Sequence, residues 1–297
     1  MLTYTVTPDD HCRSLESYLQ RLLPTAAPGY LRKLIRSGAC RLNNSDVTPS
    51  FMLKAGDLVS LKESATVAGH LKGALAPIDL LWQDDRLLVL NKPAGLAMHP
   101  AAEVDENLAD IASAWLEKRA HHPLRAYPVN RLDRGTSGVV LLATSSGNAG
   151  ILGRQVKEEG LEKRYLALVE GGVSGKGEID QPLDGKESVS RYYSLATGKS
   201  GSLLLVEPLT GRTHQIRRHL SAIGHPVAGD KRYGAASLEA LPGIALHSFR
   251  TVLRHPLPDT LLAICAPLPS HLRELIVATC GLTEKELLCL LLQCAEG

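Results

Sequence analysis

The chain of 297 residues lacks the motifs that mark several large enzyme classes. It contains no GxxxxGK(S/T), no HExxH and no GxGxxG ahead of a helical segment. Nucleotide hydrolysis, zinc proteolysis and dinucleotide redox chemistry therefore lose their usual sequence support. Its six cysteines form no CxxC pair, and none has a histidine at the spacing of a tetrahedral zinc site. We predict reduced thiols, most of them in the core, and no metal.

Targeting and membrane segments are missing as well. The N-terminus has no basic stretch followed by an apolar one, and no apolar run approaches the roughly 20 residues of a membrane span. We expect a cytoplasmic protein without membrane association, and a reducing compartment suits unpaired cysteines.

The chain also has little excess charge. Its 33 Lys and Arg are offset by 31 Asp and Glu, so the formal charge is only +2 and any affinity for a polyanion must come from local clusters. With 44% hydrophobic and 22% charged residues, the composition is that of an ordinary globular protein, which excludes disordered, collagen-like and coiled-coil classes. The length predicts about two domains.

A stretch of small residues and glycine, SATVAGHLKGALAP, separates two segments of denser pattern. We predict four parts: a domain at 1–66, a linker at 67–77, a large domain at 78–281 and a helical extension at 282–297. In the large domain, strand-like segments alternate with helical patterns at 107–120, 147–159, 213–223 and 270–280. The extension opens with a capping box, Thr283 and Glu286.

Basic residues gather on the second of two short helices in the first domain. Arg32, Lys33 and Arg36 lie there with few acids between them, which fits either a solvated helix face or a phosphate contact. The helix pair, followed by a small β element, resembles the S4 RNA-binding domain. That resemblance favours RNA contact.

The loop NRLDRGTSG, residues 130–138, leads directly into the apolar strand VVLLA. Asp133 lies there between Arg131 and Arg134, and neighbouring cations favour the ionised form of a carboxyl group. Such an aspartate can act as a nucleophile or an electrostatic group, although an ordinary surface ion pair has the same sequence pattern.

A second charged cluster lies between Glu207 and Ala235. Five cations (Arg212, Arg217, Arg218, Lys231 and Arg232) against two acids (Glu207 and Asp230) leave a local charge of 5 − 2 = +3, with three histidines besides. This is the charge pattern of a nucleic-acid site. If Thr213 to Leu220 is helical, Arg217 projects on the same side as His214.

Four ordered motifs within residues 78–280 resemble the ribosomal large subunit pseudouridine synthase A and D family: NKPAGL with a following His-Pro, RLDRxTSG, KRYLALV and TGRTHQIR. The resemblance implies an α+β fold, with a central mixed, mostly antiparallel sheet flanked by helices and preceded by the S4-like α/β module. It also implies isomerisation of uridine to pseudouridine in folded RNA, without a metal or an organic cofactor.

The resemblance further implies roles for single residues. Asp133 would be the nucleophile, either attacking the sugar or assisting loss of uracil, and Arg217 would pair with it. Tyr165 would stack on the flipped base and could take the C5 proton, while Ile216 would pack against that base. Arg131 would fill the vacated stack, and Arg134, Arg212 and His214 would contact RNA.

One position departs from the family pattern, because Asn130 stands where the family usually has histidine before Arg-Leu-Asp. An asparagine can still hydrogen-bond but cannot carry a proton-linked charge.

Several functional alternatives stay open. Ribosomal RNA is the favoured substrate because of the S4-like module, and transfer RNA is the alternative. A non-catalytic RNA-binding or ribosome-assembly factor, and hydrolysis of a nucleoside bond, would use similar groups. We expect a monomer.

Overall fold

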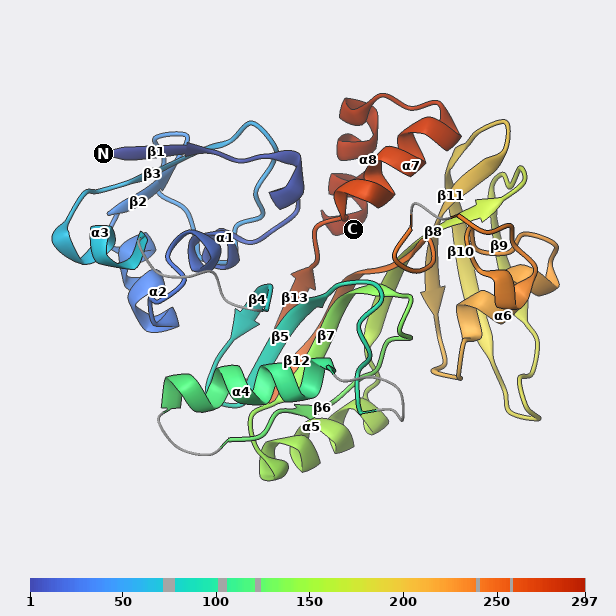
Figure 1. Cartoon of the computed structure of the whole chain (residues 1–297), viewed down its shortest axis with the longest axis horizontal. Helices are drawn as coiled ribbons and strands as arrows, with labels where there is room; N and C mark the ends of the chain where they lie inside the picture. Colours follow the sequence, from blue (N-terminus) through green and yellow to red (C-terminus); the bar gives the residue numbers. More distant parts are fainter. Residues whose placement is uncertain (72–77, 101–105, 121–123, 239–240, 257–258, 297) are drawn as a thin grey trace.

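We describe the protein from a computed structural model, in which residues 1–71, 78–100, 106–120, 124–238, 241–256 and 259–296 are described. The N-terminal module, residues 1–71, combines helices with a small antiparallel sheet, and Figure 1 shows it in blue at one end of the molecule. Its elements are β1 (Leu2–Thr5), η1 (Pro8–Asp10), α1 (Leu15–Leu22), α2 (Pro28–Arg36), β2 (Cys40–Leu42), β3 (Leu58–Leu61) and α3 (Ala65–Leu71). Ser14 caps α1 through a side-chain hydrogen bond, and Pro28 opens α2, where its fixed φ suits the first turn.

Helix α3 lies partly in the segment expected to be a linker. Its Val67 is only 1% exposed and belongs to the core of the N-terminal module. This core therefore extends past residue 66, whereas the rest of the expected linker, 72–77, lies outside the described residues.

A ten-stranded sheet forms the large domain, in the order β4-β5-β7-β12-β8-β11-β10-β9, with β13 beside β12 and β6 beside β7. The strands are β4 (Leu80–Gln83), β5 (Leu87–Lys92), β6 (Tyr127–Pro128), β7 (Ser137–Ala143), β8 (Glu162–Glu170), β9 (Lys176–Asp180), β10 (Val189–Thr197), β11 (Gly201–Pro208), β12 (Leu246–Pro256) and β13 (Asp259–Cys265). Among the described pairs in this sheet, β7 and β12 run parallel and the others antiparallel. The mixed, mostly antiparallel sheet is thus confirmed.

Both faces of the central strands are covered, because successive side chains of a strand point to opposite sides. Leu88 and Val140 face a core shared with helix α4 (Leu108–Ala120), whereas Val89 and Leu141 face a second core with helix α5 (Ser146–Glu158). All seven residues of β7 are buried, which explains its nearly continuous apolar sequence.

The remaining helices are α6 (Gln215–Ala222), η2 (Lys231–Tyr233), α7 (Ser270–Cys280) and α8 (Glu284–Glu296). The four helices expected in the large domain are confirmed to within two residues at each end. The expected capping box also forms, since the backbone N–H of Glu286 donates to Thr283 Oγ1 at 3.3 Å and the backbone N–H of Thr283 donates to the Glu286 carboxylate at 2.7 Å. None of the helices in the described ranges is long and apolar enough to cross a membrane.

Polar contacts join the N-terminal module to the large domain. Arg13, only 1% exposed, donates to both carboxylate oxygens of Asp79 at 2.7 and 2.8 Å. Ser17 Oγ donates to the carbonyl oxygen of Leu80 at 2.6 Å, and Arg273 of α7 donates to Asp9 at 2.8 Å. The module is therefore held against strand β4 and the C-terminal helices.

Candidate active site

Asp133 lies in the loop that enters strand β7. The loop turns sharply, since the backbone N–H of Thr136 donates to the carbonyl oxygen of Asp133 at 3.0 Å. Behind it, Gly138 has a φ of 112°, and a Cβ there would lie 2.2 Å from the carbonyl oxygen of Ser248 on β12. Glycine is thus required where β7 and β12 meet. The Asp133 side chain nevertheless keeps 29% exposure, so a fixed backbone presents an accessible carboxylate.

Lys92, at the end of β5, bonds both to the loop that follows β5 and to the loop that contains Asp133. Its Nζ donates to the carbonyl oxygens of Pro93, Leu96 and Arg134 at 2.8, 2.8 and 3.2 Å, which uses all three ammonium donors. Burial lowers the pKa of Lys92 to about 8, and the nearby Asp133 opposes that shift. The lysine therefore fixes the backbone next to Asp133.

Helix α6 brings the second motif to the same place. Gln215, its first residue, accepts hydrogen bonds at Oε1 from Thr210 Oγ1 at 2.7 Å and from the backbone N–H of Arg212 at 3.0 Å. These bonds fold the preceding loop onto the helix. His214 stands between loop and helix with a φ of 54°, a left-handed conformation that non-glycine residues adopt at a cost.

Arg217 of α6 joins two carboxylates. Its Nη1 donates to Asp133 Oδ2 at 2.8 Å, while Nε and Nη2 donate to the two oxygens of Asp230 at 2.6 and 2.9 Å. The guanidinium also lies over the ring of Tyr233, 5.0 Å from its centroid. Burial alone would lower the pKa of Arg217, but its bonds to Asp230 and Asp133 outweigh this and raise it. A permanent cation thus faces Asp133.

His214 lies on the other side of the Asp133 carboxylate. Its Nε2 is 3.7 Å from Asp133 Oδ1, and its Nδ1 is 2.8 Å from the hydroxyl of Tyr233. Burial lowers the pKa of His214 below its usual value, with Asp133 acting in the opposite sense. The imidazole is therefore mostly neutral at pH 7.

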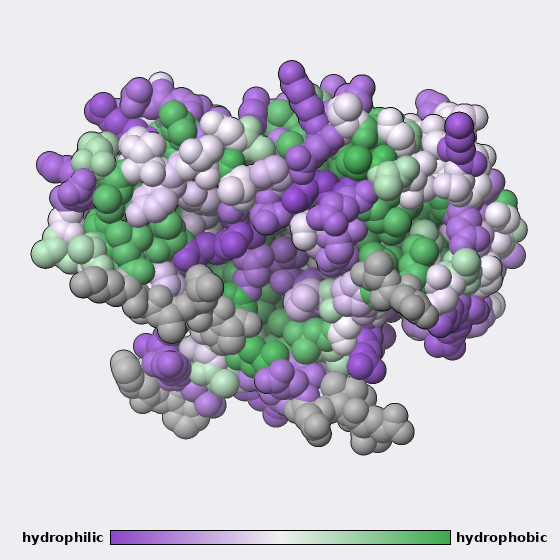
Figure 2. Space-filling view, turned by 45° about the horizontal axis from the view of Figure 1, so that its top comes forward, coloured by the Kyte–Doolittle hydropathy of each residue, from purple (hydrophilic) through white to green (hydrophobic). Residues whose placement is uncertain are grey.

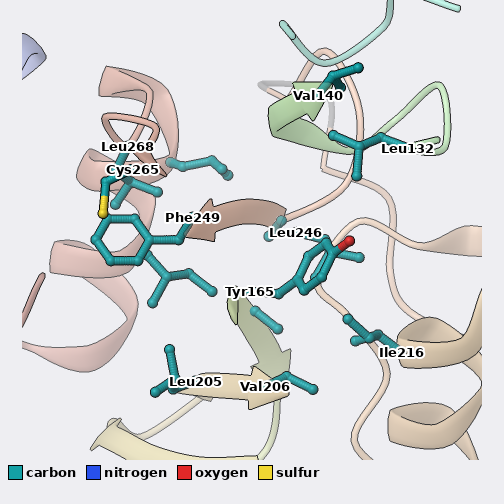
Figure 3. Close-up of a cluster of buried hydrophobic side chains, with 14 of the residues drawn as sticks. Leu132, Val140, Tyr165, Leu205, Val206, Ile216, Leu246, Phe249, Cys265 and Leu268 are labelled. Carbon is teal, nitrogen blue, oxygen red and sulfur yellow. The ribbon is translucent and has the colours of Figure 1, made fainter. Parts of the chain in front are cut away.

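Tyr165, on β8, is buried among apolar side chains from three other segments. Figure 3 shows its ring with Leu132, Ile216 and Leu246 around it, and all four belong to the main core cluster. Burial raises the pKa of Tyr165 to about 12, and the Asp133 charge adds to that shift. The phenol therefore keeps its proton at neutral pH, and its ring forms an apolar wall near the carboxylate.

Asp133, Tyr165 and Arg217 line one cavity of about 750 Å³. Eight residues expected from the sequence to act at the site are among its lining: Arg131, Asp133, Arg134, Tyr165, Arg212, His214, Ile216 and Arg217. Arg131, Arg134 and Arg212 are exposed, so cations surround a mouth whose interior is partly apolar. On the face drawn in Figure 2, hydrophilic residues gather in the middle, with hydrophobic areas to either side.

The three cations expected on the N-terminal module, in α2, lie apart from this cavity. Lys33 and Arg36 are exposed, whereas Arg32 donates to the Glu16 carboxylate at 2.9 Å and to the carbonyl oxygen of Gln83 at 2.7 Å. Arg32 therefore contributes to the contact with strand β4.

Sequence reasoning missed three residues around the cavity. Asp230 is 1% exposed and lies behind Arg217, and Lys92 lies beneath the loop. Lys163 lines the cavity two residues before Tyr165, on the same side of β8, and burial lowers its pKa. Two of their contacts join residues well apart in sequence, Asp230 with Arg217 and Lys92 with the carbonyl oxygen of Arg134, and a local pattern does not reveal such contacts.

Asn130, which stands where a histidine was expected, has a structural contact. Its Oδ1 accepts a hydrogen bond from the backbone N–H of Leu141 at 2.8 Å, which fixes the strand beside the Asp133 loop.

Comparison with known proteins identifies the family. A family model described as RNA pseudouridylate synthase matches residues 86–222, which contain all four motifs. The ribosomal large subunit pseudouridine synthase C of Escherichia coli strain K12 is 30% identical over 302 residues, 91% of this chain and 93% of that protein. The chain belongs to the RNA pseudouridylate synthase family. The synthase of the same name from Haemophilus ducreyi is 29% identical over 304 residues, 92% of this chain and 94% of the other.

Solved structures agree with this assignment. The human RNA pseudouridylate synthase domain containing 1 has a TM-score of 0.54 and 27% identity, covering 66% of this synthase and 86% of the human chain. The human domain containing 4 protein shares the fold, with a TM-score of 0.54 and 24% identity over 66% of this synthase and 92% of the human chain. This synthase is an enzyme that isomerises uridine in RNA. Assignment to the A and D group, and the S4-like nature of the N-terminal module, stay predictions.

Proposed function

We propose that this synthase modifies large-subunit ribosomal RNA, with the Asp133 carboxylate as the group that opens the N-glycosidic bond. The observation that carries the catalytic role is the asymmetry of that carboxylate. Arg217 Nη1 donates to Oδ2 at 2.8 Å, whereas Oδ1 lies 3.7 Å from His214 Nε2, and the residue lines the cavity. One oxygen is thus held in place, and the other can reach a substrate.

The reaction that this geometry supports begins at C1′ of the target nucleotide. Asp133 either attacks C1′ or stabilises the charge that develops as uracil leaves, and Arg217 holds the carboxylate in its orientation. The free base turns and forms a bond from C5 to C1′. N1 gains a proton and C5 loses one, so atoms and charge balance and the mass of the RNA is unchanged.

Tyr165 and Ile216 are the groups that would hold the base during this turn. The tyrosine ring offers a stacking surface, and an apolar wall lets a base rotate without breaking fixed hydrogen bonds. The protonated phenol, with a pKa of about 12, can relay the C5 proton through its oxygen but cannot act as a preformed phenolate at neutral pH.

Exposed cations would hold the RNA itself. Arg131, Arg134 and Arg212 surround the cavity mouth, where they can contact phosphates, and the flat guanidinium of Arg131 can fill the stack left by an extruded nucleotide. Lys33 and Arg36 supply a second, separate contact on the N-terminal module. The names of the relatives, which specify the ribosomal large subunit, support that RNA as the substrate.

The experiment is transcriptome-wide pseudouridine mapping after deletion of the gene, with complementation by wild type, Asp133→Asn and Asp184→Asn. Asp184 is exposed and pairs with Arg218, the residue after Arg217 on α6. Its variant is therefore a matched control. We expect one or a few large-subunit ribosomal sites to lose modification, and wild type and Asp184→Asn to restore them.

Four outcomes would contradict parts of the proposal. Loss of transfer RNA sites alone would overturn the ribosomal assignment. Restoration by Asp133→Asn would overturn the role of Asp133. Release of free uracil with abasic RNA by the purified protein would indicate hydrolysis, and unchanged maps with copurifying RNA would indicate a binding factor.

A further inference from the structure

His214 has one ring nitrogen bonded within the protein and one left for a ligand. Its Nδ1 lies 2.8 Å from the hydroxyl of Tyr233, whereas its Nε2 forms no hydrogen bond with any described residue. Nε2 is also not among the fully buried polar atoms that lack a partner, so it is accessible, and His214 lines the cavity. The nitrogen without a protein partner is therefore the one that a substrate can reach.

The contacts of the ring also assign its tautomer. Nε2 lies 3.7 Å from Asp133 Oδ1, and a lone pair on Nε2 would face the negative charge of the carboxylate. A hydrogen on Nε2 removes that repulsion, and Nδ1 then accepts the hydrogen of the Tyr233 hydroxyl. Burial lowers the pKa of His214, which keeps the ring neutral at pH 7. Nε2–H is therefore a neutral donor beside Asp133.

The backbone holds this ring in place at a conformational cost. His214 has a φ of 54° and a ψ of 26°, in the left-handed region, directly before helix α6. Its ring also packs edge-on against the ring of Tyr233, with 5.7 Å between the two centroids. Strained residues that their surroundings hold fixed are typical of functional sites, where the strain serves to aim a side chain.

The position of Nε2 relative to Asp133 selects the substrate atom that it would bind. Asp133 Oδ1 forms no hydrogen bond with a described residue, and a reacting carbon lies about 3 to 3.5 Å from its nucleophile. With C1′ at that distance from Oδ1, the ribose groups next to C1′ come within reach of Nε2. The two that carry an acceptor oxygen are the ring oxygen O4′ and the 2′-hydroxyl. A donor at O4′ would oppose the positive charge that develops there as uracil leaves, whereas a hydrogen bond to a hydroxyl beside the reacting carbon strengthens in the transition state of glycoside cleavage.

We propose that His214 Nε2–H donates a hydrogen bond to the 2′-hydroxyl of the target nucleotide, and that Tyr233 holds the imidazole in the tautomer that can donate. This inference rests on the proposed role of Asp133 and deepens it, because it assigns the group that recognises the target as a ribonucleotide. The 2′-hydroxyl is the feature by which a protein distinguishes RNA from DNA at one position. His214 thus acts on the sugar, and Tyr165 and Ile216 act on the base.

The first measurement is the single-turnover rate of isomerisation on the RNA that the wild type modifies, with full-length enzyme in saturating excess, which separates chemistry from binding. Asparagine tolerates the left-handed backbone but places no atom at the Nε2 position, so we expect His214→Asn to slow the reaction about 100-fold. Glutamine can place an amide N–H there, and His214→Gln should stay within about tenfold of wild type. The control is His225→Asn, the same change at a histidine that contacts the Glu170 carbonyl oxygen outside the cavity, and it should keep the wild-type rate. A wild-type rate for His214→Asn, or equally slow asparagine and glutamine variants, would overturn the inference.

A change in the substrate tests the contact with the 2′-hydroxyl directly. In the Asp133→Asn background, where bound RNA does not react, affinities are measured for RNA with uridine and with 2′-deoxyuridine at the target position. We expect the uridine RNA to bind about tenfold more tightly, the usual contribution of one hydrogen bond. Adding His214→Asn should reduce this preference to less than about threefold. A preference that is absent before His214→Asn, or unchanged after it, would overturn the inference.

Tyr233→Phe tests the tautomer, because it removes the hydroxyl but keeps the ring that lies against Arg217. It should slow the reaction about tenfold in the wild-type background and by less than about threefold when added to His214→Asn. Equal losses in both backgrounds would overturn the role of Tyr233. Asp133→Asn is measured alongside. If that variant isomerises the RNA, the proposed function itself fails, which is distinguishable from a failure at His214.

Discussion

Two buried arginines, Arg13 in the N-terminal module and Arg217 beside the cavity, each lie between two aspartates and serve different ends. Arg13 is 1% exposed and pairs with Asp10 and Asp79, which joins the module to the large domain. Arg217 is 9% exposed and pairs with Asp230 and Asp133. The residue types and the charges are the same in both clusters.

The difference lies in what remains unoccupied on the second carboxylate. Asp79 has both oxygens engaged by Arg13, and its Oδ2 also accepts from Asn91 at 3.0 Å. Asp133 has Oδ2 bonded to Arg217, and its side chain lines the cavity. A buried ion pair is therefore structural when both oxygens of its carboxylate are bonded within the protein. It is a candidate functional site when the carboxylate lines a cavity.

The largest expected effect comes from removing each arginine in turn. Arg217→Gln should lower the rate of isomerisation by roughly 10² to 10³, the usual loss when one preorganised electrostatic group is removed. Arg13→Gln should keep the rate per folded molecule but lower the free energy of unfolding by about 3 to 5 kcal/mol, because it leaves buried acids unpaired. Single-turnover kinetics and urea unfolding measure the two quantities. If Arg13→Gln lost catalysis without losing stability, the structural role assigned to Arg13 would be wrong.

A buried base with no acid among its contacts in the described part of the chain should behave unlike either arginine. His247 is 0% exposed, and burial lowers its pKa to about 4, against the weaker opposing effect of its hydrogen bond to Ala266. The unfolded chain takes up this proton near pH 6.5, so between pH 6.5 and 4 the unfolded state binds more protons and stability falls as pH falls. The contribution is roughly 3 kcal/mol by pH 4.

Urea unfolding of wild type and His247→Gln at pH 7, 5.5 and 4.5 measures this contribution. The variant should have a flatter dependence of stability on pH. Identical slopes in the two proteins would show that His247 does not stay neutral in the folded state.

The exposed cations of α2 should affect RNA affinity rather than catalysis. Replacing both Lys33 and Arg36 by glutamine should reduce the slope of log K against log salt by about 1 to 2, if each contacts one phosphate. Arg32→Gln is the matched control, because its side chain is already engaged by Glu16 and Gln83 and should leave the slope unchanged. Fluorescence titrations at several salt concentrations measure this. An unchanged slope in the double variant would remove the module's predicted RNA contact.

The smallest effect is expected at the start of helix α8. This helix contacts the N-terminal module through a hydrogen bond between its Leu288 carbonyl oxygen and His11 Nε2. Thr283→Ala removes the capping box and should lower stability by about 1 kcal/mol. Thermal melting measures the change, and the isomerisation rate at a low temperature should equal that of wild type. A slower reaction would mean that the C-terminal helices support the cavity as well as the module.

Periodicity and capping residues predicted the local elements well. Helix α5 could be predicted because Ser145 and a helical pattern follow directly on an apolar strand, and α8 because Thr283 and Glu286 form a local box. Helix α3 was missed, because its sequence of small residues has one buried side chain, Val67, whose partners come from elsewhere in the N-terminal module. Local patterns report local forces, and a helix stabilised mainly by distant contacts leaves little trace in its own residues.

Candidate site residues followed the same rule. Asp133 and Arg217 lie in charged motifs that can be recognised in the sequence, although 84 positions separate them. Asp230 carried no signal of its own, because a single aspartate beside a glycine is typical of a turn. Lys92 was part of a motif, but its contact with the carbonyl oxygen of Arg134 depends on how β5 and β7 pair.

Residue types and local patterns were enough to predict the chemical groups and most of the helices and strands, because these depend mainly on neighbours a few positions away. Which groups meet depends on how the strands and helices pack together. The parallel contact of β7 with β12, the docking of α6 beside Asp133 and the burial of Asp230 behind Arg217 join segments far apart in the chain. Strand order and side-chain direction determine these contacts. The surroundings that the fold gives a carboxylate then decide whether it is structural or reactive.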